Sequence, residues 1–420
     1  MQKSDLYDVI VIGAGAAGLI AAISAAREGK KTLLLEKLPN IGAKLKATGG
    51  GRCNLTNTLA NEEFMARFGR NGRFMTTALK AFDHRSLISF FEEIGVESHA
   101  PDGFRVFPLS HDSVSVVSAL ESEIKRLGVL LICSAKVERL EFEDARICGV
   151  SANGVYYKAS NVIVAAGGLG YPKLGAEGDG FALASSAGHK IEPPHPAMLP
   201  LHTKESWVAS CRADTVAKAQ IRIDMPKAKN LRAVGDLIFT QRGVRGPVVL
   251  DFAREITPLL QKYGEVPIFI NMTKGMNEEE IRLHLKEEAD KNPHLPISAH
   301  IETMLAASIA KELCILADID PSESLKKIAG AKRDKLIKLL AWTPLTITGH
   351  EGFKAAMITR GGVSLKEICP ETMESRLIRG LYFCGEVMDL DGPCGGYNLQ
   401  WSFASGFLAG RLGDAPAPLA

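Results

Sequence analysis

A strand-like segment followed by three spaced glycines decides the fold of this chain: Tyr7–Ile12 reads YDVIVI, and Gly13-Ala14-Gly15-Ala16-Ala17-Gly18 follows at once. The first segment is short, β-branched and almost wholly apolar, which predicts a buried strand. We expect Gly13 to make the tight turn out of that strand, Gly15 to let a pyrophosphate approach the backbone, and Gly18 to let a helix pack close to the sheet. The pattern therefore predicts a nucleotide-binding turn between a strand and a helix.

The residues after this turn extend the prediction. An Ala-rich helix is expected over 19–28, and its N-terminal N–H groups and positive dipole end would face the phosphates. A second strand is expected over 31–35 and ends at Glu36. A carboxylate at that position accepts hydrogen bonds from ribose hydroxyls, and it would repel a 2′-phosphate. The first site therefore suits FAD or NAD and not NADP.

Length, charge and hydropathy narrow the class of protein. The 420 residues are enough for two or three domains. Lys and Arg number 50 against 48 Asp and Glu, a net charge of +2, so we expect neither nucleic acid nor an anionic membrane as a partner. There is no run of about 18 apolar residues, so no membrane span is expected. The sequence leaves the oligomeric state open and is compatible with a monomer.

The cysteines and the polar start of the chain favour a cytoplasmic location. The eight cysteines are scattered and form no CxxC pair, which argues against a zinc site or a redox dithiol. They are expected to be reduced thiols. Residues 1–8 are polar and lead straight into the first strand, unlike a signal peptide. We expect no metal ion.

Residues 130–168 begin to separate FAD from NAD. Strands are expected at 130–142, 145–152 and 155–158, with an Asn153-Gly154 hairpin turn before the last. A buried strand is then expected over 161–166. A meander of three strands before a returning parallel strand resembles the FAD-binding fold of glutathione reductase.

Residues 380–410 complete that resemblance. A short strand at 381–384 is followed by Gly385-Glu386, by Asp389 and by a helix that begins near Gly396. The arrangement resembles the terminal FAD motif, in which the acid binds the ribityl chain or the pyrophosphate side. The N-terminus of the helix would face the pyrimidine edge of the flavin and stabilise its reduced anion.

A second nucleotide domain is not expected. The glycines at 175–180 resemble a nucleotide loop, but no strand precedes them, and no other GxGxxG follows a strand. NAD(P)H would therefore bind transiently in the substrate cleft as an electron donor, or would not be used.

The loop after the second strand adds a third glycine-rich segment. Gly49-Gly50-Gly51-Arg52-Cys53-Asn54 requires unusual backbone angles or very close backbone contact. Arg52 and Asn54 could hold phosphate or the flavin edge, and Lys44 adds positive charge. Small-residue packing is the simpler explanation of Cys53. The predicted FAD-binding residues are Gly13, Gly15, Ala16, Ala17, Gly18, Glu36, Lys37, Lys44, Gly50, Gly51, Arg52, Cys53, Asn54, Val137, Ala166, Gly167, Gly385, Glu386, Asp389, Gly396, Tyr397, Asn398 and Leu399.

The stretch GGGRCNLTN at 49–57 resembles the signature of a bacterial flavoprotein family that contains BaiN-type bile-acid reductases, aminoacetone oxidase and many NAD(P)/FAD-dependent oxidoreductases. The resemblance covers the whole chain and implies a three-domain flavoprotein, distantly similar to the flavin subunits of fumarate reductase and aspartate oxidase. The family usually has a histidine near the start of the loop at 241–247, and a small residue where Arg245 or Arg360 stands here. If these arginines face the substrate, that substrate is more anionic than those of the relatives.

The middle of the chain predicts two inserted parts. Residues 198–202, 221–225, 236–240 and 266–270 are strand-like, a helix is expected from Pro247 to about 260, and further helices are expected at 277–290, 298–316 and 322–341. The fold class is therefore α/β: a Rossmann-like, glutathione-reductase-type FAD-binding domain (1–195 and 357–420), a β-rich substrate domain (196–272 and 341–356) and a small helical cap domain (273–340). The lysines on the last helix are expected to form a solvated face.

The chemistry stays less defined than the cofactor. The candidate catalytic residues are Arg52, Cys53, Tyr171, His195, Arg360 and Tyr397, and none identifies a reaction by itself. A serine–histidine–aspartate arrangement or a metal-ligand cluster is not evident. Three interpretations stay open: NAD(P)H-linked reduction of an activated C=C bond in a small molecule, oxidation of a small amine or alcohol, and a non-enzymatic flavin-binding redox module. The resemblance favours the first.

Overall fold

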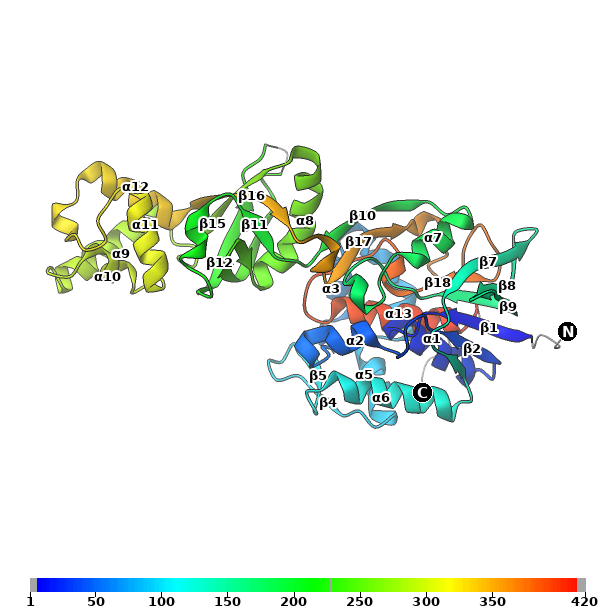
Figure 1. Cartoon of the computed structure of the whole chain (residues 1–420). Helices are drawn as coiled ribbons and strands as arrows, with labels where there is room; N and C mark the ends of the chain where they lie inside the picture. The colour runs from blue at the N-terminus through cyan, green and yellow to red at the C-terminus, as the bar shows by residue number, and fades with distance from the viewer. Residues whose placement is uncertain (1–5, 227, 414–420) are drawn as a thin grey trace. The chain divides into compact units, whose positions relative to one another are not determined.

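The structure, a computed structural model, describes residues 6–226 and 228–413 (Figure 1). The described chain divides into two compact units. The first unit comprises residues 1–196 and 357–420, and the second unit comprises residues 197–356. The helices of the 273–340 region belong to the same unit as the strands that flank them, so a separate helical domain stays a prediction.

A mixed sheet forms the centre of the first unit, in the order β6-β2-β1-β9-β8-β7, with β18 also paired to β9. Strands β6, β2, β1 and β18 run parallel to their neighbours. The apolar residues of β1, β2 and β18 are buried, as expected for a sheet covered by helices, whereas Leu130 on the edge strand β6 is exposed. The strands are β1 (Tyr7–Ile12), β2 (Thr32–Leu35), β6 (Leu130–Ile132), β7 (Val137–Glu143), β8 (Arg146–Ala152), β9 (Val155–Val164) and β18 (Leu381–Phe383).

Strand β9 corrects two sequence-based boundaries. The stretches expected at 155–158 and 161–166 are one continuous strand, Val155–Val164. Its first half pairs antiparallel with β8, and its second half pairs parallel with β1 and β18. The strand expected at 130–142 is instead two strands, β6 and β7, separated at Ser134, which has a φ of +55°. Sequence periodicity does not show where a strand changes partners.

Helix α13, from the C-terminal part of the chain, packs against α1 and completes the N-terminal fold (Figure 1). The two backbones approach closely at glycines: a Cβ at Gly406 would lie 2.3 Å from the Ala17 carbonyl oxygen, and one at Gly410 would lie 2.4 Å from that of Ala21. The helices of this unit are α1 (Ala16–Arg27), α2 (Ala43–Ala47), α3 (Asn61–Ala66), α4 (Thr76–Ala81), α5 (His84–Glu93), α6 (Ser113–Arg126), α7 (Asp179–Ser186) and α13 (Tyr397–Gly410).

Two small sheets accompany the large one. Strands β3 (Thr56–Asn57), β5 (Arg105–Pro108) and β4 (Ser98–His99) form one of them, directly after the triple-glycine segment. Strands β10 (Ile191–Ala197) and β17 (Ile358–Val363) form the other, which brings residues near 195 beside residues near 360.

The second unit contains a closed barrel in the order β11-β14-β13-β12-β15-β16. Its apolar core includes residues two apart on the same strand, as expected for inward-facing positions: Ile221 and Ile223 on one strand, and Ile268 and Ile270 on another. Strand bounds differ from the expected ones by several residues, and β16 was not expected. The strands are β11 (Leu201–Thr203), β12 (Thr215–Ile223), β13 (Arg232–Thr240), β14 (Gly243–Arg245), β15 (Val266–Asn271) and β16 (Thr343–His350).

Helix α8 packs on the barrel, and the remaining helices of this unit follow β15. Helix α8 begins at Pro247 as expected, but it continues through Pro258 to Tyr263. Hydrogen bonding of Ser308 to Asp214 ties α11 to the start of β12. The expected helices at 298–316 and 322–341 are each interrupted. The helices are α8 (Pro247–Tyr263), α9 (Glu278–Lys291), α10 (Ile297–Ile301), α11 (Ala307–Leu316) and α12 (Gly330–Ala341).

The predicted α/β class is confirmed, with a parallel nucleotide-binding sheet in one unit and a small β-barrel in the other. Within the described residues, no helix has the length and apolar character needed to cross a bilayer.

Candidate active site

The carboxyl ends of four parallel strands meet at one edge of the large sheet. The Gly13 N–H donates to the Leu35 carbonyl at 2.7 Å, and the Ala165 N–H donates to that of Ile12 at 2.9 Å. The Cys384 N–H similarly donates to the Val164 carbonyl. The fold therefore gathers the turn at 13–18, the residue after β2, and the residues after β9 and β18. Ligands of open α/β sheets bind at such an edge.

The glycines of the turn have different reasons to be glycine. Gly13 has a φ of +97°, and a Cβ there would lie 2.7 Å from the Ala165 carbonyl oxygen. A Cβ at Gly18 would lie 1.8 Å from the Gly13 carbonyl oxygen, so only glycine lets α1 pack this closely. Gly15, the N-cap of α1, has a φ of −85° and no protein atom within 4 Å of a built Cβ. A ligand that touches the backbone there explains this glycine.

Glu36 is held at the turn by backbone amides. Only 9% of its surface is exposed. Its Oε2 accepts from the Ala14 N–H and its Oε1 from the Leu38 N–H, each at 2.8 Å. Each oxygen keeps a further lone pair, which could accept from a ribose hydroxyl. The carboxylate therefore stands where the sequence predicts it.

Two predicted cofactor residues lie beside Glu36. Lys37 pairs with Glu177 at 2.7 Å and with Asp179. Burial lowers the pKa of Lys37, but the two carboxylates outweigh that effect and raise it. Val137 begins β7, and the Ala135 N–H donates to the Glu36 carbonyl at 2.8 Å, so the start of β7 adjoins the proposed ribose site.

The triple-glycine segment forms an open turn. Gly50 and Gly51 have φ angles of +66° and +87°, and neither would bring a Cβ within 4 Å of another protein atom. Arg52 is exposed, and its guanidinium lies 5.3 Å from the ring centre of Phe107. Cys53 is fully buried, which raises the pKa of its thiol to about 12. Its thiol therefore stays protonated at neutral pH, as the packing interpretation expects.

This segment packs against the N-terminus of α13. The Asn54 amide, in the orientation its neighbours require, accepts from the Gly396 N–H at 3.0 Å and donates to the Thr56 carbonyl. Asn57 Nδ2 donates to the Gly395 carbonyl at 2.9 Å. A Cβ at Gly396 would lie 2.5 Å from Thr56 backbone atoms. Two segments that are more than 330 residues apart in sequence thus form one wall.

Two other predicted cofactor residues bind each other. Lys44 Nζ lies 2.6 Å from Glu386 Oε2, while Glu386 Oε1 accepts from the Thr359 N–H at 2.9 Å. The Thr359 hydroxyl in turn accepts from the Leu169 N–H. A Cβ at Gly168 would collide with this Thr359–Glu386 pair, whereas Gly167, with a φ of +71°, has no protein atom near a built Cβ.

The first turn of α13 contains the last group of predicted contacts, Tyr397, Asn398 and Leu399. Asn398 exchanges hydrogen bonds with Gly392: its Oδ1 accepts at 2.8 Å and its Nδ2 donates at 2.9 Å. The Tyr397 ring is buried and lies 5.0 Å from the ring of Phe64. A role of Tyr397 as a proton donor stays a prediction.

These features fit FAD. An open glycine at a helix N-terminus suits a diphosphate, and a carboxylate at the end of β2 suits the adenosine ribose. Further glycines with no protein neighbour, Gly50, Gly51 and Gly167, lie at the same sheet edge or in the adjoining loop. The individual FAD contacts stay predictions.

Candidate catalytic residues His195 and Arg360 come together on the paired strands β10 and β17. Burial, and then the charge of Arg360, lower the pKa of His195. Asp389 joins them: its pKa is raised by burial and by Glu192, against the opposing effects of Arg360 and the Gly361 N–H. Asp389, predicted as a cofactor contact, thus lies within the electrostatic reach of Arg360 and is itself a candidate proton donor.

Tyr171 makes a separate case. It has a φ of +57°, uncommon for a bulky residue, and precedes Pro172 at the start of a short 3₁₀ segment. Residues held in such conformations concentrate at functional sites. Arg52 lies beside the Phe107 ring, and Tyr397 lies beside the Phe64 ring.

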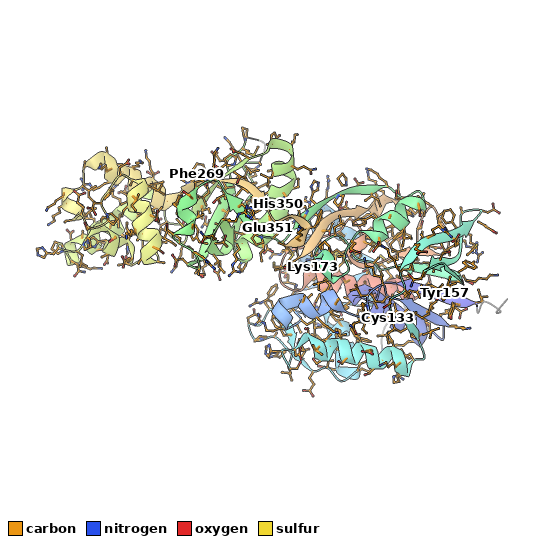
Figure 2. All side chains as sticks on the ribbon, in the orientation of Figure 1. Cys133, Tyr157, Lys173, Phe269, His350 and Glu351 are labelled. Carbon is orange, nitrogen blue, oxygen red and sulfur yellow. The ribbon has the colours of Figure 1, made fainter. Side chains whose placement is uncertain are left out.

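A titratable group in the second unit was missed by sequence analysis. His202 Nε2 lies 3.0 Å from Glu351 Oε1, and Arg242 lies 3.2 Å from the same oxygen. His350 and Glu351 follow one another at the end of β16 (Figure 2). Burial, and then the charge of His202, lower the pKa of His350. Only the pairing of β11 with β16 and β14 brings these residues together, so no local signal predicts the group.

A contacting set of Ser375, His189 and Glu367 was also not predicted. His189 Nε2 lies 2.8 Å from Ser375 Oγ, and its Nδ1 lies 3.2 Å from Glu367 Oε2. Ser375 is buried, and its hydroxyl oxygen already accepts from the Leu377 and Ile378 N–H groups. The serine is therefore a turn-stabilising residue and no exposed nucleophile.

The fold and this site together define a flavin-dependent oxidoreductase. The chain belongs to the HI0933-like family: the sequence model of the HI0933-like protein Rossmann domain matches residues 7–412. The predicted family, enzyme class and FAD cofactor are thereby confirmed, and the non-enzymatic interpretation is removed.

Relatives of known name cover nearly the whole chain. The 3-dehydro-bile acid delta(4,6)-reductase of Clostridium scindens is 33% identical over 403 residues, 96% of this chain and 97% of its own. The ribosomal RNA dihydrouridine synthase of Haemophilus influenzae is 30% identical over 415 residues, covering 96% and 98%. The enzyme of that name from Escherichia coli K12 is 28% identical over 405 residues, covering 96% and 97%.

Solved structures share the fold at low sequence identity. A flavocytochrome c3 fumarate reductase superposes with a TM-score of 0.52 at 17% identity, covering 98% of this chain and 78% of its own. The 3-ketosteroid delta1-dehydrogenase of Sterolibacterium denitrificans superposes with a TM-score of 0.52 at 12% identity, covering 97% and 99%. At these identities the likeness supports the fold of a flavoenzyme and no particular reaction.

Proposed function

We propose that this enzyme reduces a C=C bond conjugated to a carbonyl group, with NAD(P)H as the electron donor. The relationship to two kinds of named reductive enzyme, each over 96% of the chain, carries the proposal. A delta(4,6) bond in a 3-dehydro steroid and the ring C=C of uridine are both polarised by a carbonyl. The shared chemistry is hydride addition at the carbon β to the carbonyl and proton addition at the α carbon.

The chain offers groups suited to the two ends of such a substrate. Arg360 supplies a cation that could stabilise negative charge developing on the carbonyl oxygen. Asp389, whose pKa is raised, could deliver the proton, because a carboxyl with an elevated pKa keeps its proton closer to neutral pH. Bound FAD would supply the two-electron transfer. His195, which lies beside Arg360, would orient the same end of the substrate.

NAD(P)H use is part of the proposal. The turn at Gly13–Gly18, occupied by FAD in this assignment, is the GxGxxG motif that follows a strand in this chain. We infer that the nicotinamide binds transiently in the substrate cleft and leaves before the alkene enters. A small-molecule substrate and a cytoplasmic location stay predictions, as does the state of oligomerisation.

Anaerobic spectroscopy of the FAD-loaded protein tests the proposal. NADH or NADPH is expected to bleach the visible flavin band, and a steroid dienone or uridine added without oxygen is expected to restore it. A flavin that resists both nicotinamides but is bleached by a small amine or alcohol would contradict the proposal and support the oxidase interpretation.

Variants of the proposed polar groups sharpen this test. Arg360→Ala is expected to lower kcat/KM for the alkene by about a hundredfold, since one charged hydrogen-bond donor to a developing oxyanion is worth about 10²–10³ in rate. Asp389→Asn is expected to slow flavin reoxidation by the alkene while leaving reduction by NAD(P)H unchanged. Unchanged kinetics in Arg360→Ala would remove Arg360 from the site, together with the hypothesis of a more anionic substrate.

A further inference from the structure

The outer wall of the barrel in the second unit carries two arginines and two aromatic rings. In the strand pairing, Arg222 on β12 lies opposite Arg232 on β13 and opposite Phe269 on β15. Trp342 immediately precedes β16, the next strand along. We call Arg222, Arg232, Phe269 and Trp342 the arginine face. Figure 2 labels Phe269 on this part of the barrel.

The planar Arg222 guanidinium lies close to both aromatic rings of this face. The Arg222 guanidinium lies 4.1 Å from the ring centre of Trp342 and 5.0 Å from that of Phe269. Both arginines are exposed, while the two rings are half-buried. A guanidinium in such a stack keeps its N–H donors at its edge, free to point toward solvent or a ligand. Val234, opposite Gln220 in the same strand pair, extends the face with an apolar side chain that is 64% exposed.

Arg222 and Arg232 place two like charges on neighbouring strands. Arg222 and Arg232 stand directly opposite one another in an antiparallel pair, an arrangement that destabilises a sheet when nothing separates the charges. Among the ion pairs of residues 6–226 and 228–413, none joins a carboxylate to either arginine. An anionic ligand would relieve this repulsion, and two guanidinium groups on neighbouring strands suit two successive phosphates.

We propose that the arginine face binds single-stranded RNA, with phosphates on Arg222 and Arg232 and a base stacked beside Phe269 and Trp342. Aromatic rings next to cations are the combination that binds unpaired nucleotides, because every base has a π-face and every nucleotide a phosphate. A duplex hides its base faces and would engage the arginines alone. The overall charge of +2 predicts no nucleic-acid partner, but the local surface decides binding.

The inference rests on the proposed function in one respect: a uridine of the bound RNA contains a C=C bond that the proposed reductase could reduce. Binding itself does not require turnover. A failed reductase assay would therefore leave the binding measurement readable, and a failed binding measurement would leave reduction of small enones intact.

Fluorescence anisotropy of the FAD-loaded, full-length protein with a labelled oligouridylate of about 12 nucleotides is the test. Arg222→Gln/Arg232→Gln is expected to weaken binding at least about tenfold and to reduce the salt dependence, log K against log salt, by about 1.4. Phe269→Leu, which keeps apolar volume but removes the ring, is expected to weaken binding about fivefold or more with an unchanged salt slope.

A matched variant locates the site. Lys332→Gln/Lys338→Gln removes the same number of charges from exposed positions of α12, another basic surface of this unit. Wild-type affinity in that variant, together with weak binding in the arginine variant, supports the proposal. Equal losses in both variants, loss in the α12 variant alone, no binding by the wild type, or equal affinity for duplex RNA would each overturn it. Wild-type rates with a small enone in the arginine variant show that the flavin site is intact.

Discussion

The two units are specified by different kinds of contact. In the first unit, close backbone packing requires glycine at particular positions. Gly18, Gly406 and Gly410 each let a helix lie within van der Waals distance of another backbone segment. In the second unit, the barrel closes through contacts between remote segments, such as the Thr346 N–H donating to Glu205, 141 residues away. Short sequence motifs therefore predict the first unit, whereas the second unit is defined by strand pairing.

The two units also differ in how far their binding surfaces can be predicted from sequence. At the edge of the large sheet, the glycines that no protein atom requires mark the space left for a ligand, as Gly15 does. The barrel has no such motif, and its arginine face is visible only when residues from separate strands are placed in register.

Gly18→Ala should destabilise the first unit most. Its Cβ would lie 1.8 Å from the Gly13 carbonyl oxygen, a backbone atom that cannot move without opening the turn. We expect the apoprotein to lose about 3 kcal/mol of stability in chemical denaturation, even though alanine favours a helix by about 1 kcal/mol. Wild-type stability in this variant would contradict the close packing of α1 on the turn.

Glu36→Ala should weaken FAD retention by about a hundredfold, because ribose hydrogen bonds to a charged acceptor are lost. Apoprotein stability should also fall, since the Ala14 and Leu38 N–H groups lose their acceptor. Glu36→Gln is the matched control: it keeps the size of the side chain and one acceptor oxygen, so its losses should be intermediate. Full flavin occupancy in Glu36→Ala, measured by absorbance after gel filtration, would count against the ribose assignment.

Gly15→Ala should separate binding from folding. Because a Cβ there meets no protein atom, apoprotein stability should change by less than about 0.5 kcal/mol. FAD affinity should fall about tenfold or more, since the Cβ would occupy the space next to the diphosphate. Titration of apoprotein with FAD, followed by flavin fluorescence, measures this. Unchanged affinity would mean that the diphosphate does not touch this glycine.

Ser308→Ala should test how the second unit is held together. Loss of the hydrogen bond between Ser308 and Asp214 should cost about 1–2 kcal/mol, because the bond is charge-assisted. If the barrel and the helices fold as one unit, both should unfold in the same transition and shift together. Circular dichroism and Trp fluorescence measure the transition. If the helical signal is lost first, a separate helical domain is supported instead. Ser298→Ala, on α10, is a control serine in the same region.

His189 should give the smallest effect, a dependence of stability on pH. Burial lowers its pKa, against the opposing charge of Glu367, so the unfolded chain binds a proton more readily than the folded chain. Its contribution to stability is therefore complete above the unfolded pKa of about 6.5 and is lost as the pH falls below it. Denaturation midpoints of the wild type should drop between about pH 6.5 and 5 more steeply than those of His189→Gln. Parallel curves of denaturation midpoint against pH for the two proteins would contradict the lowered pKa of His189.

Much of the first unit is predictable because its signals are local. The YDVIVI strand, the glycine turn and Glu36 lie within one βαβ segment, and each residue meets its backbone partner a short distance along the chain or at a neighbouring strand end. The continuous strand β9 is not predictable in the same way, because its change of partners from β8 to β1 leaves no mark in its own periodicity.

For the candidate polar groups too, local sequence identifies some residues, but the fold determines which of them lie together. His195 and Arg360 were singled out from their sequence neighbourhoods, but that they lie on paired strands, with Asp389 as a third member, follows from the sheet of β10 and β17. His202 with Glu351, and Ser375 with His189, were not expected at all, since each pair joins segments more than 140 residues apart.

Sequence alone is enough to predict the nucleotide turn of the FAD type after the first strand and its completion by residues 380–410. The reason is that tight turns, close helix packing and ribose binding each demand a particular residue at a particular position. The closed barrel, the grouping of the polar candidates and the arginine face emerge from the three-dimensional fold. These depend on which distant strands pair and in what register, and many sequences satisfy the same pairing.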